Sequence, residues 1–330
     1  MNVKNVYSIL WLTIIFLIIS GCAHHIKVSE EKIQTVYLVE STSNDPVAQF
    51  APVFLAHNHQ KQYNRIGKPS ASIDVNGKEK IYIDDNYPVF YFMVRNFTTE
   101  KDTYTNYIYR VHFPRIPFSL IPYHLTAGRN VGLITVVTVD SRNKPVLLTT
   151  VHTCGCYLAI IPTSNLPADS FPDNWKGNKL KVYGERLPSI LDYSKHEIPK
   201  VLIYLRPGVH RVMDLEIIDN QNIEMDYRFN KTITPLAPMD DLMRIPINGN
   251  FTDFYHSKGL MKGYVKGSVK IWESLFLSLI SLDLFVGTDK IYGDPDITGN
   301  KFYTSLKPWN RDASDMWDFK KFLDFWGWRL

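Results

Sequence analysis

The sequence predicts a mainly β protein with C-terminal helices, an α+β arrangement in which an antiparallel β-sandwich or open barrel is packed by one or two helices. Between about residues 35 and 224, short apolar runs alternate with Gly, Pro, Asn and Asp, as strands and turns do. Tyr (19), Phe (18), Trp (7) and Pro (19) are numerous, which favours sheets joined by turns. No long helix separates these runs, so parallel βαβ winding is not expected.

Length and composition limit the class of protein before any motif is considered. The 330 residues suit one large domain or two modest ones, and 45% hydrophobic with 21% charged residues is a globular composition. The net charge of +4 arises from 37 basic and 33 acidic residues without a long basic block. A nucleic-acid partner is therefore not expected.

Residues 1–21 have the plan of a secretory signal peptide. Lys4 precedes an apolar stretch from Val6 to Ile19, which is shorter than the roughly 20 residues that a membrane-spanning helix needs. Small residues follow this stretch directly, as processing requires. An uncleaved anchor helix is the alternative that this pattern leaves open.

The tetrad Ile19-Ser20-Gly21-Cys22 resembles the lipobox of bacterial lipoprotein precursors. The resemblance covers residues 1–22 and implies that Cys22 carries diacylglyceryl and N-acyl chains, such as palmitate, at the mature amino terminus. Two or more acyl chains attach a protein stably, so the implied partner is a membrane, with residues 22–35 as the tether. Ala23, where an Asp would signal inner-membrane retention, implies the outer membrane of a Gram-negative cell, on its periplasmic or surface face.

Residues 36–225 are expected to form the β-rich domain. Residues 131–139 and 146–151 are rich in β-branched side chains and flank a polar turn, so they predict a hairpin. An S-x-x-K match, Ser141 to Lys144, falls in this turn and is assigned to it. Further strands are predicted at residues 81–83, 89–94, 107–113, 201–205 and 209–217.

Three prolines within nine positions predict an extended loop at residues 114–124, whose apolar side chains cover a core edge or line a pocket. Residues 226–330 are expected to be a helical region that packs on the β domain. Residues 269–286 predict a helix with one narrow polar stripe, so we expect a deeply covered core helix, with a membrane-dipping or partner-facing helix as the alternative. Residues 314–326 predict an amphipathic helix that docks on the body or lies on lipid.

His152, Cys154 and Cys156 form the most unusual constellation in the sequence. They follow a predicted strand at spacings of two, so an imidazole and two sulfurs are expected on one face. Such a set suits Zn or Cu, although C-x-C is a weak metal signal. With Cys22 acylated, the two thiols can pair only with each other within the chain, in a small and readily reduced ring. Two buried, reduced cysteines are the third alternative.

Other side chains are weaker candidates for a site. His57, His59 and His124 are candidate ligands that the sequence alone does not bring together. No catalytic residue is predicted, because the motifs G-x-S-x-G, H-E-x-x-H, G-x-x-x-x-G-K-[ST] and G-x-G-x-x-G are absent. Four arginines near predicted turns are expected to form strand-end ion pairs or to bind an anionic ligand: Arg65, Arg110, Arg206 and Arg211.

Three functions remain compatible with these patterns. The favoured one is a lipid-anchored cell-envelope protein with a non-catalytic binding or accessory role, with an envelope protein as a further partner. The second is a metal-binding or thiol-redox protein that uses His152, Cys154 and Cys156. The third is a hydrolase with an unrecognised site. An enzyme is thus the less expected outcome.

Overall fold

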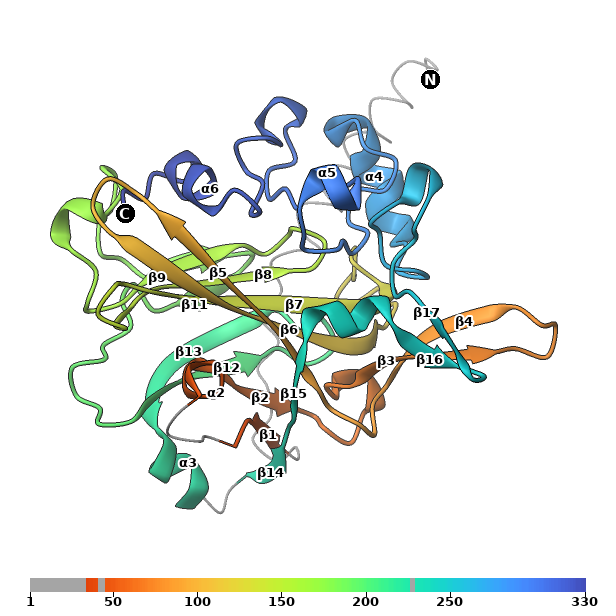
Figure 1. Ribbon diagram of the computed structural model, residues 1–330, viewed down its shortest axis with the longest axis horizontal. Helices are drawn as coiled ribbons and strands as arrows, with labels where there is room; N and C mark the ends of the chain where they lie inside the picture. The colour runs from red at the N-terminus through yellow and green to blue at the C-terminus, as the bar shows by residue number, and fades with distance from the viewer. Residues whose placement is uncertain (1–33, 41–44, 226–228) are drawn as a thin grey trace, which may run out of the picture.

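The structure is a computed structural model that describes residues 34–40, 45–225 and 229–330. Cys22 and most of the predicted tether lie outside the described residues. The last two tether positions, Gln34 and Thr35, already belong to the first strand, Gln34–Leu38 (β1). Within the described residues the chain forms a six-stranded sheet, a five-stranded sheet and three two-stranded ones (Figure 1).

The six-stranded sheet has the order β15-β5-β6-β7-β8-β9 and is antiparallel except for the pair β15 and β5. Its strands are Leu236–Pro238 (β15), Phe90–Thr98 (β5), Thr103–Ile116 (β6), Gly128–Val139 (β7), Pro145–His152 (β8) and Ala159–Pro162 (β9). β6, β7 and β8 are almost wholly buried, which their near-continuous β-branched and aromatic content allows.

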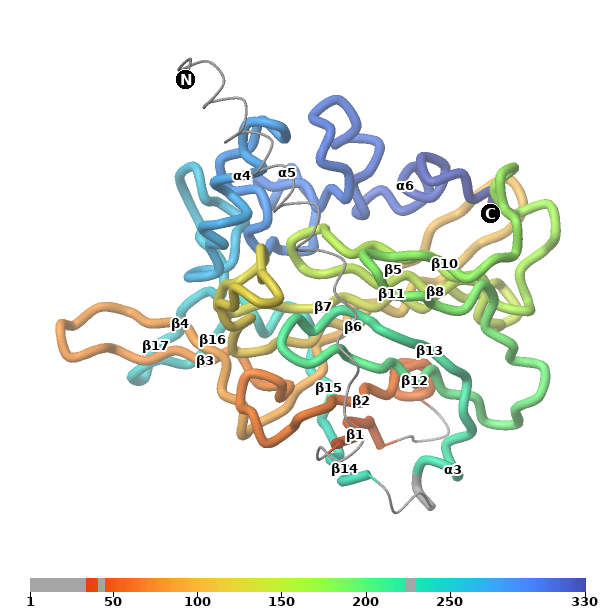
Figure 2. Tube along the Cα trace, turned by 180° about the vertical axis from the view of Figure 1, so that it is seen from behind, coloured from red at the N-terminus to blue at the C-terminus, as the bar shows by residue number. Residues whose placement is uncertain are grey.

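The five-stranded sheet has the order β13-β12-β2-β1-β14 and mixes antiparallel pairs with two parallel ones, β12 with β2 and β1 with β14. Besides β1, its strands are Val53–His57 (β2), Pro199–Leu205 (β12), Val212–Asp219 (β13) and Asn230–Ile233 (β14). Three hairpins complete the strands: Lys68–Ile73 (β3) with Glu79–Asp84 (β4), Leu180–Val182 (β10) with Glu185–Leu187 (β11), and Ile245–Ile247 (β16) with Asn250–Thr252 (β17). The β10–β11 hairpin contacts β9 through β10 and β13 through β11, so it joins one edge strand of each large sheet; Figure 2 shows it beside β13.

The helices are short and lie mostly in the C-terminal third of the chain. They are Pro46–Phe50 (α2), Asn220–Met225 (α3), Ile271–Ser281 (α4), Pro295–Thr298 (α5) and Phe319–Phe325 (α6), with 3-10 turns at Gln62–Asn64, Ala168–Ser170, Met239–Met243, Gly259–Met261 and Pro308–Asn310. None of the helices in the described part of the chain combines the length and apolar character that crossing a bilayer requires.

The six-stranded sheet is the middle of three layers. One of its faces packs against the five-stranded sheet, where Tyr109 and Leu133 share a core with Phe54 and Ile203. Its other face packs against the C-terminal region in a second core, formed by Ile108, Ile134, Val136 and Val151 with Phe254, Phe302, Met316 and Phe322. The predicted fold class is therefore confirmed, as a sandwich-like α+β arrangement with helices packed on it, and no sheet of the described residues closes into a barrel.

Several local predictions are confirmed. Residues 131–139 and 146–151 form the antiparallel pair β7 and β8, and residues 140–144 form its turn, with the Asp140 amide donating to the Lys144 carbonyl (3.0 Å). All five further predicted strands overlap observed ones. Residues 226–330 are less helical than predicted, because they also supply β14 to one large sheet and β15 to the other.

The prediction for residues 269–286 is wrong in its burial. The helix α4 is shorter than predicted and ends at Ser281, where Leu282 follows in a left-handed conformation (φ 49°) as the C-cap. It turns its polar side toward the protein. Its outward side is apolar, with Leu279 79% exposed. The reason is that buried polar groups of the protein body need partners, and the polar side of this segment supplies them. Lys270, for example, pairs with the buried carboxylate of Asp289 (3.1 Å).

The two other predictions for apolar segments have opposite outcomes. The segment at residues 114–124 covers the core only at its start, where Ile116 ends β6 and is buried; the loop that follows exposes Phe118, Leu120 and Ile121. The C-terminal helix α6 begins at Phe319, five residues after the predicted start, because Asp318 caps it by accepting from the Lys321 amide (3.2 Å). It docks on the body, as predicted, through Phe319 and neighbouring buried side chains.

Candidate functional site

The candidate site begins where β8 ends. The amide of His152 donates to the Cys156 carbonyl (2.9 Å) and the Gly155 amide donates to the His152 carbonyl (2.7 Å), which closes a tight turn. Gly155 has φ +92°, and a Cβ there would lie 2.1 Å from the Tyr303 carbonyl oxygen. Only glycine accommodates both this backbone conformation and this close approach.

This turn joins Cys154 and Cys156 in a disulfide, with their Cα atoms 5.6 Å apart. One ligand atom from each of His152, Cys154 and Cys156 lies within 4.8 Å of the others. Among residues 34–40, 45–225 and 229–330, these three form the one group of at least three His, Cys, Asp or Glu side chains with convergent ligand atoms. The structure thus brings together the three residues that the sequence singled out, and of the alternatives left open it has the bridged form.

Two cavities meet at the disulfide. The larger, about 570 Å³, is lined by Cys156, Tyr157, Tyr183, Trp326 and Trp328, among others. The smaller, about 210 Å³, is lined by both cysteines together with Glu273, Leu277 and Tyr303. Cys154 is only 4% exposed, whereas Cys156 is half-buried and borders both cavities. The two sulfurs therefore differ in accessibility.

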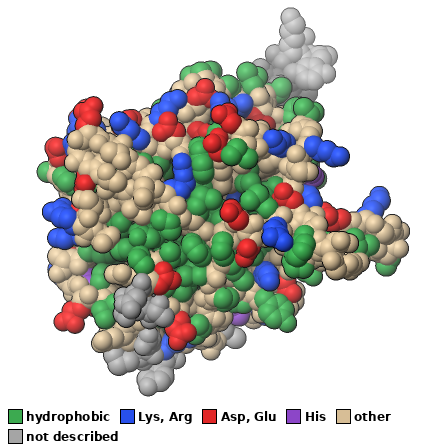
Figure 3. All heavy atoms as spheres, in the orientation of Figure 1, with side chains coloured by type: hydrophobic (Ala, Val, Ile, Leu, Met, Phe, Trp, Pro, Cys, Tyr) green, Lys and Arg blue, Asp and Glu red, His purple; other side chains and the backbone are tan. Residues whose placement is uncertain are grey.

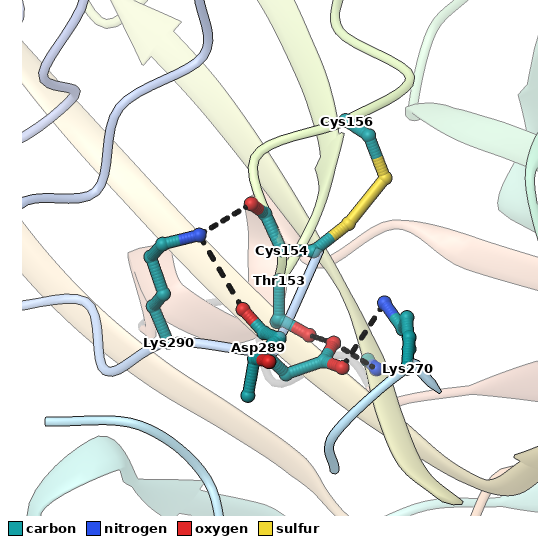
Figure 4. The surroundings of a disulfide bond; sticks show 8 residues. Thr153, Cys154, Cys156, Lys270, Asp289 and Lys290 are labelled. Atoms are coloured by element: carbon teal, nitrogen blue, oxygen red, sulfur yellow. Dashed lines mark hydrogen bonds and ion pairs between the residues drawn. A yellow bond between two sulfur atoms is a disulfide. The ribbon is translucent and has the colours of Figure 1, made fainter. Parts of the chain in front are cut away.

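A network of buried charges lies behind the turn (Figure 4). Asp289 accepts a hydrogen bond from the Thr153 hydroxyl and pairs with Lys270, 3.1 Å away. The Lys290 ammonium donates to the Cys154 carbonyl (2.8 Å), and burial lowers the pKa of Lys290 to about 8. These contacts fix the backbone on both sides of the first cysteine.

The same network reaches the middle of the six-stranded sheet. Arg110, on β6, donates from Nη1 to the Lys290 carbonyl (2.8 Å) and from Nε to Nε2 of His112 (3.1 Å). Both side chains are fully buried on the face of the sheet that meets the C-terminal region. The buried guanidinium of Arg110 is thereby linked to the loop that carries Lys290. The hydrogen bond from the Lys290 ammonium extends this link to the carbonyl of Cys154.

Glu273, on the inner side of α4, is an ionisable group aimed at the smaller cavity. The side chain is 4% exposed, and its Oε2 atom has no hydrogen-bond partner among the described residues. Burial raises the pKa of this carboxyl, and the nearby Lys270 opposes the rise. Glu273 therefore holds or releases a proton closer to neutral pH than an ordinary glutamate does.

His152 is neutral in the folded protein. Burial, with a smaller contribution from the charge of Lys270, holds its pKa well below the ordinary value. Both ring nitrogens are buried without a geometrically good hydrogen bond in the described part of the structure. A neutral imidazole offers one ring-nitrogen lone pair to a metal ion.

The weaker candidate ligands do not join this group. His57 ends β2, where its ring stacks on that of Tyr204 with centroids 6.4 Å apart. His59 hydrogen-bonds the Tyr37 hydroxyl through Nε2 (2.8 Å), and His124 hydrogen-bonds the Pro117 carbonyl through Nδ1 (2.8 Å). Each of these two is held by a local polar contact.

The four arginines act mainly in ion pairs. Arg65 pairs with Asp85 (3.1 Å), and both Arg206 and Arg211 pair with the buried carboxylate of Glu185. Arg110 instead enters the network behind the turn. The ion-pair interpretation therefore accounts for three of the four.

Sequence reasoning missed the charged members of the site: Lys270, Glu273, Asp289 and Lys290. The signal that could have found two of them is a charged residue within an apolar stretch: Glu273 interrupts such a stretch, and Lys270 starts its narrow polar stripe.

Comparison with known proteins finds no family model that matches the chain, and neither a curated protein nor a solved structure that resembles it.

Proposed function

We propose that the protein is a lipid-anchored protein of the cell envelope that exchanges thiols and disulfides through Cys154 and Cys156. The observation that carries the proposal is that the disulfide borders two cavities with one sulfur more accessible than the other. The resemblance of residues 1–22 to lipoprotein precursors supports the location, since disulfides persist outside the cytosol. Of the functions compatible with the sequence, this one uses the most features of the site.

The difference in accessibility sets the order of the steps. A substrate thiolate attacks Sγ of Cys156, forms a mixed disulfide with it, and displaces Cys154 as a thiolate. A second substrate thiol then displaces Cys156, so the substrate leaves as a disulfide. Two electrons pass to the protein, and the two thiol protons of the substrate end on Cys154 and Cys156. The reverse sequence reduces a substrate disulfide.

Neighbouring charges suit this chemistry. Lys290 donates to the backbone carbonyl of Cys154 and so holds the turn that carries the first sulfur in place. Glu273 borders the same cavity with a raised pKa, which fits a group that accepts the thiol proton and returns it. The aromatic lining of the larger cavity, with Trp326 and Trp328, suits a cysteine-containing peptide as substrate.

A second candidate function is favoured by His152. Its neutral imidazole lies within 4.8 Å of both sulfurs, so after reduction of the disulfide it would complete a set of one nitrogen and two thiolates for Zn or Cu(I). This metal-binding role shares the residues of the first proposal but requires the reduced state.

The experiment uses the full acylated chain, purified in detergent without reductant. We expect no titratable thiol before reduction and two per chain afterwards, because Cys22 is acylated. With a synthetic peptide whose two cysteines are joined in a disulfide, the lone thiolate of Cys154→Ser should open that disulfide and trap a mixed disulfide on Cys156, with the second peptide sulfur released as a thiol. The matched variant Cys156→Ser should trap about tenfold less, since its remaining sulfur is buried. Two thiols before reduction, or equal trapping by the two variants, would overturn the proposal.

The same reduced sample tests the metal role. Zn or Cu bound in stoichiometric amount by the reduced wild type and lost in His152→Phe, which keeps a ring but removes both nitrogens, would assign the site to metal binding. If neither exchange nor metal binding is measured, the favoured sequence-based function, a non-catalytic binding or accessory role, replaces both proposals.

A further inference from the structure

The outward side of α4 and the adjacent loop form one apolar surface. We call it the apolar face and define it by Phe118, Leu120, Ile121, Ile271, Trp272, Leu275, Leu279 and Ile280, all of which are exposed. Ile121 is 91% exposed at the tip of the loop. The loop and the helix are continuous, because the ring of Phe118 stacks on that of Trp272 with centroids 6.0 Å apart.

The orientation of α4 is fixed by its inner side. Lys270 precedes the helix and pairs with Asp289, and Ser274 donates from its hydroxyl to the Val286 carbonyl (3.2 Å). Arg311 donates to the Ser281 carbonyl at the other end. Turning the apolar side inward would break these contacts and expose buried charge, so the helix keeps its apolar residues outside. A contiguous apolar surface of this kind marks an interaction site.

We infer that the apolar face lies on the lipid bilayer to which the chain is anchored. Cys22, the predicted acylation site, precedes Gln34 by 12 positions, and an extended chain of that length spans at most ~40 Å. The anchor thus holds the body beside a bilayer at a high effective concentration, where a modest apolar surface is enough to dock.

The composition of the apolar face agrees with a lipid surface as its occupant. Its outward helical positions carry no charge, and its aliphatic residues are more exposed than its tryptophan, Trp272, which is 38% exposed. Tyr123 borders the same ring, with centroids 6.4 Å apart. Tryptophan and tyrosine favour the boundary between acyl chains and headgroups. This inference rests on the predicted lipidation and is independent of thiol exchange.

The experiment uses the full acylated protein in vesicles of phosphatidylethanolamine with a minor fraction of phosphatidylglycerol. Brominated acyl chains should quench tryptophan fluorescence, and Trp272→Phe should remove most of that quenching. The control Trp175→Phe, which changes a ring packed against Trp328 outside the apolar face, should leave the quenching unchanged. Equal quenching in wild type and Trp272→Phe would overturn the inference.

A second variant separates docking from anchoring. Leu275→Glu combined with Leu279→Glu alters two exposed positions, so the protein should fold and stay attached through its acyl chains while the quenching of Trp272 is lost. Quenching that persists in this double variant would contradict the inference. Sedimentation in detergent that reveals a dimer, broken by the two glutamates, would assign the apolar face to a second copy and equally overturn it.

Discussion

At the scale of single residues, Gly155 determines whether the two cysteines can meet. It combines a positive φ with an approach to the Tyr303 carbonyl that leaves no room for a side chain. Lys290 holds the neighbouring carbonyl of Cys154 from the other side. The turn is thus shaped by one residue with no side chain and one with a long buried side chain.

Gly155→Ala should therefore lower the free energy of unfolding by about 3 kcal/mol or more, because strained backbone and a clash with backbone add together. The matched change Gly77→Ala, at φ +74° with nothing within 4 Å of the new Cβ, should cost only about 1 kcal/mol. Urea unfolding of both variants measures the difference. Equal losses would show that the contact with Tyr303 does not constrain the turn.

At the scale of elements, patterns within one strand were predictable and pairings between distant segments were not. β7 and β8 were predicted because alternation and a polar turn are local properties. The parallel pairs β1 with β14, β12 with β2 and β15 with β5 join segments far apart in the chain, for which the sequence contains no local signal.

The helix α4 was misjudged for the same reason. Its apolar residues predicted burial and its serines predicted a small solvent-facing stripe, because a helix normally turns apolar side chains inward. Its actual orientation depends on Asp289, a partner beyond the helix that the helical pattern does not contain. His152, Cys154 and Cys156 do lie together, as their spacing predicted, but through the tight turn at Gly155 and not through the alternation of a continuing strand.

Substitutions on the inner and outer sides of α4 should show that its polar side, and not its apolar side, faces the protein. Ser281→Leu places a larger apolar side chain where the serine is fully buried, and we expect a loss of about 1–3 kcal/mol in the free energy of unfolding. Leu279→Ser, on the exposed side of α4, should change it by no more than about 0.5 kcal/mol. Thermal and urea unfolding give both values, and the reverse ranking would place the apolar side of α4 inside.

At the scale of the whole molecule, buried histidines make the free energy of unfolding depend on pH. His112, His152 and His210 are buried between layers, and burial holds the pKa of each below the ordinary 6.5, to about 3 for His210. All three are neutral when folded but take up protons in the unfolded chain below pH 6.5. On the face seen in Figure 3, acidic and basic side chains are interspersed.

Because the unfolded state binds more protons, the free energy of unfolding should fall as the pH drops below 6.5, by up to about 1.4 kcal/mol per pH unit for each histidine. His210→Phe keeps the ring that stacks on Phe113 but cannot titrate, so its slope should be smaller by about that amount per unit. Urea unfolding across this acidic range measures both slopes. An unchanged slope in the variant would mean that His210 already takes up a proton in the folded state.

One helix, α4, separates the outside of the molecule from the smaller cavity beside the disulfide, the chamber of about 210 Å³. It presents Leu275 and Leu279 outward, while Glu273 and Leu277, one turn apart, form part of the chamber wall. Any small displacement of this helix changes the shape of the chamber and the distance between the Glu273 carboxyl and the two sulfurs. A contact that moved α4 from outside would therefore also move one wall of this chamber.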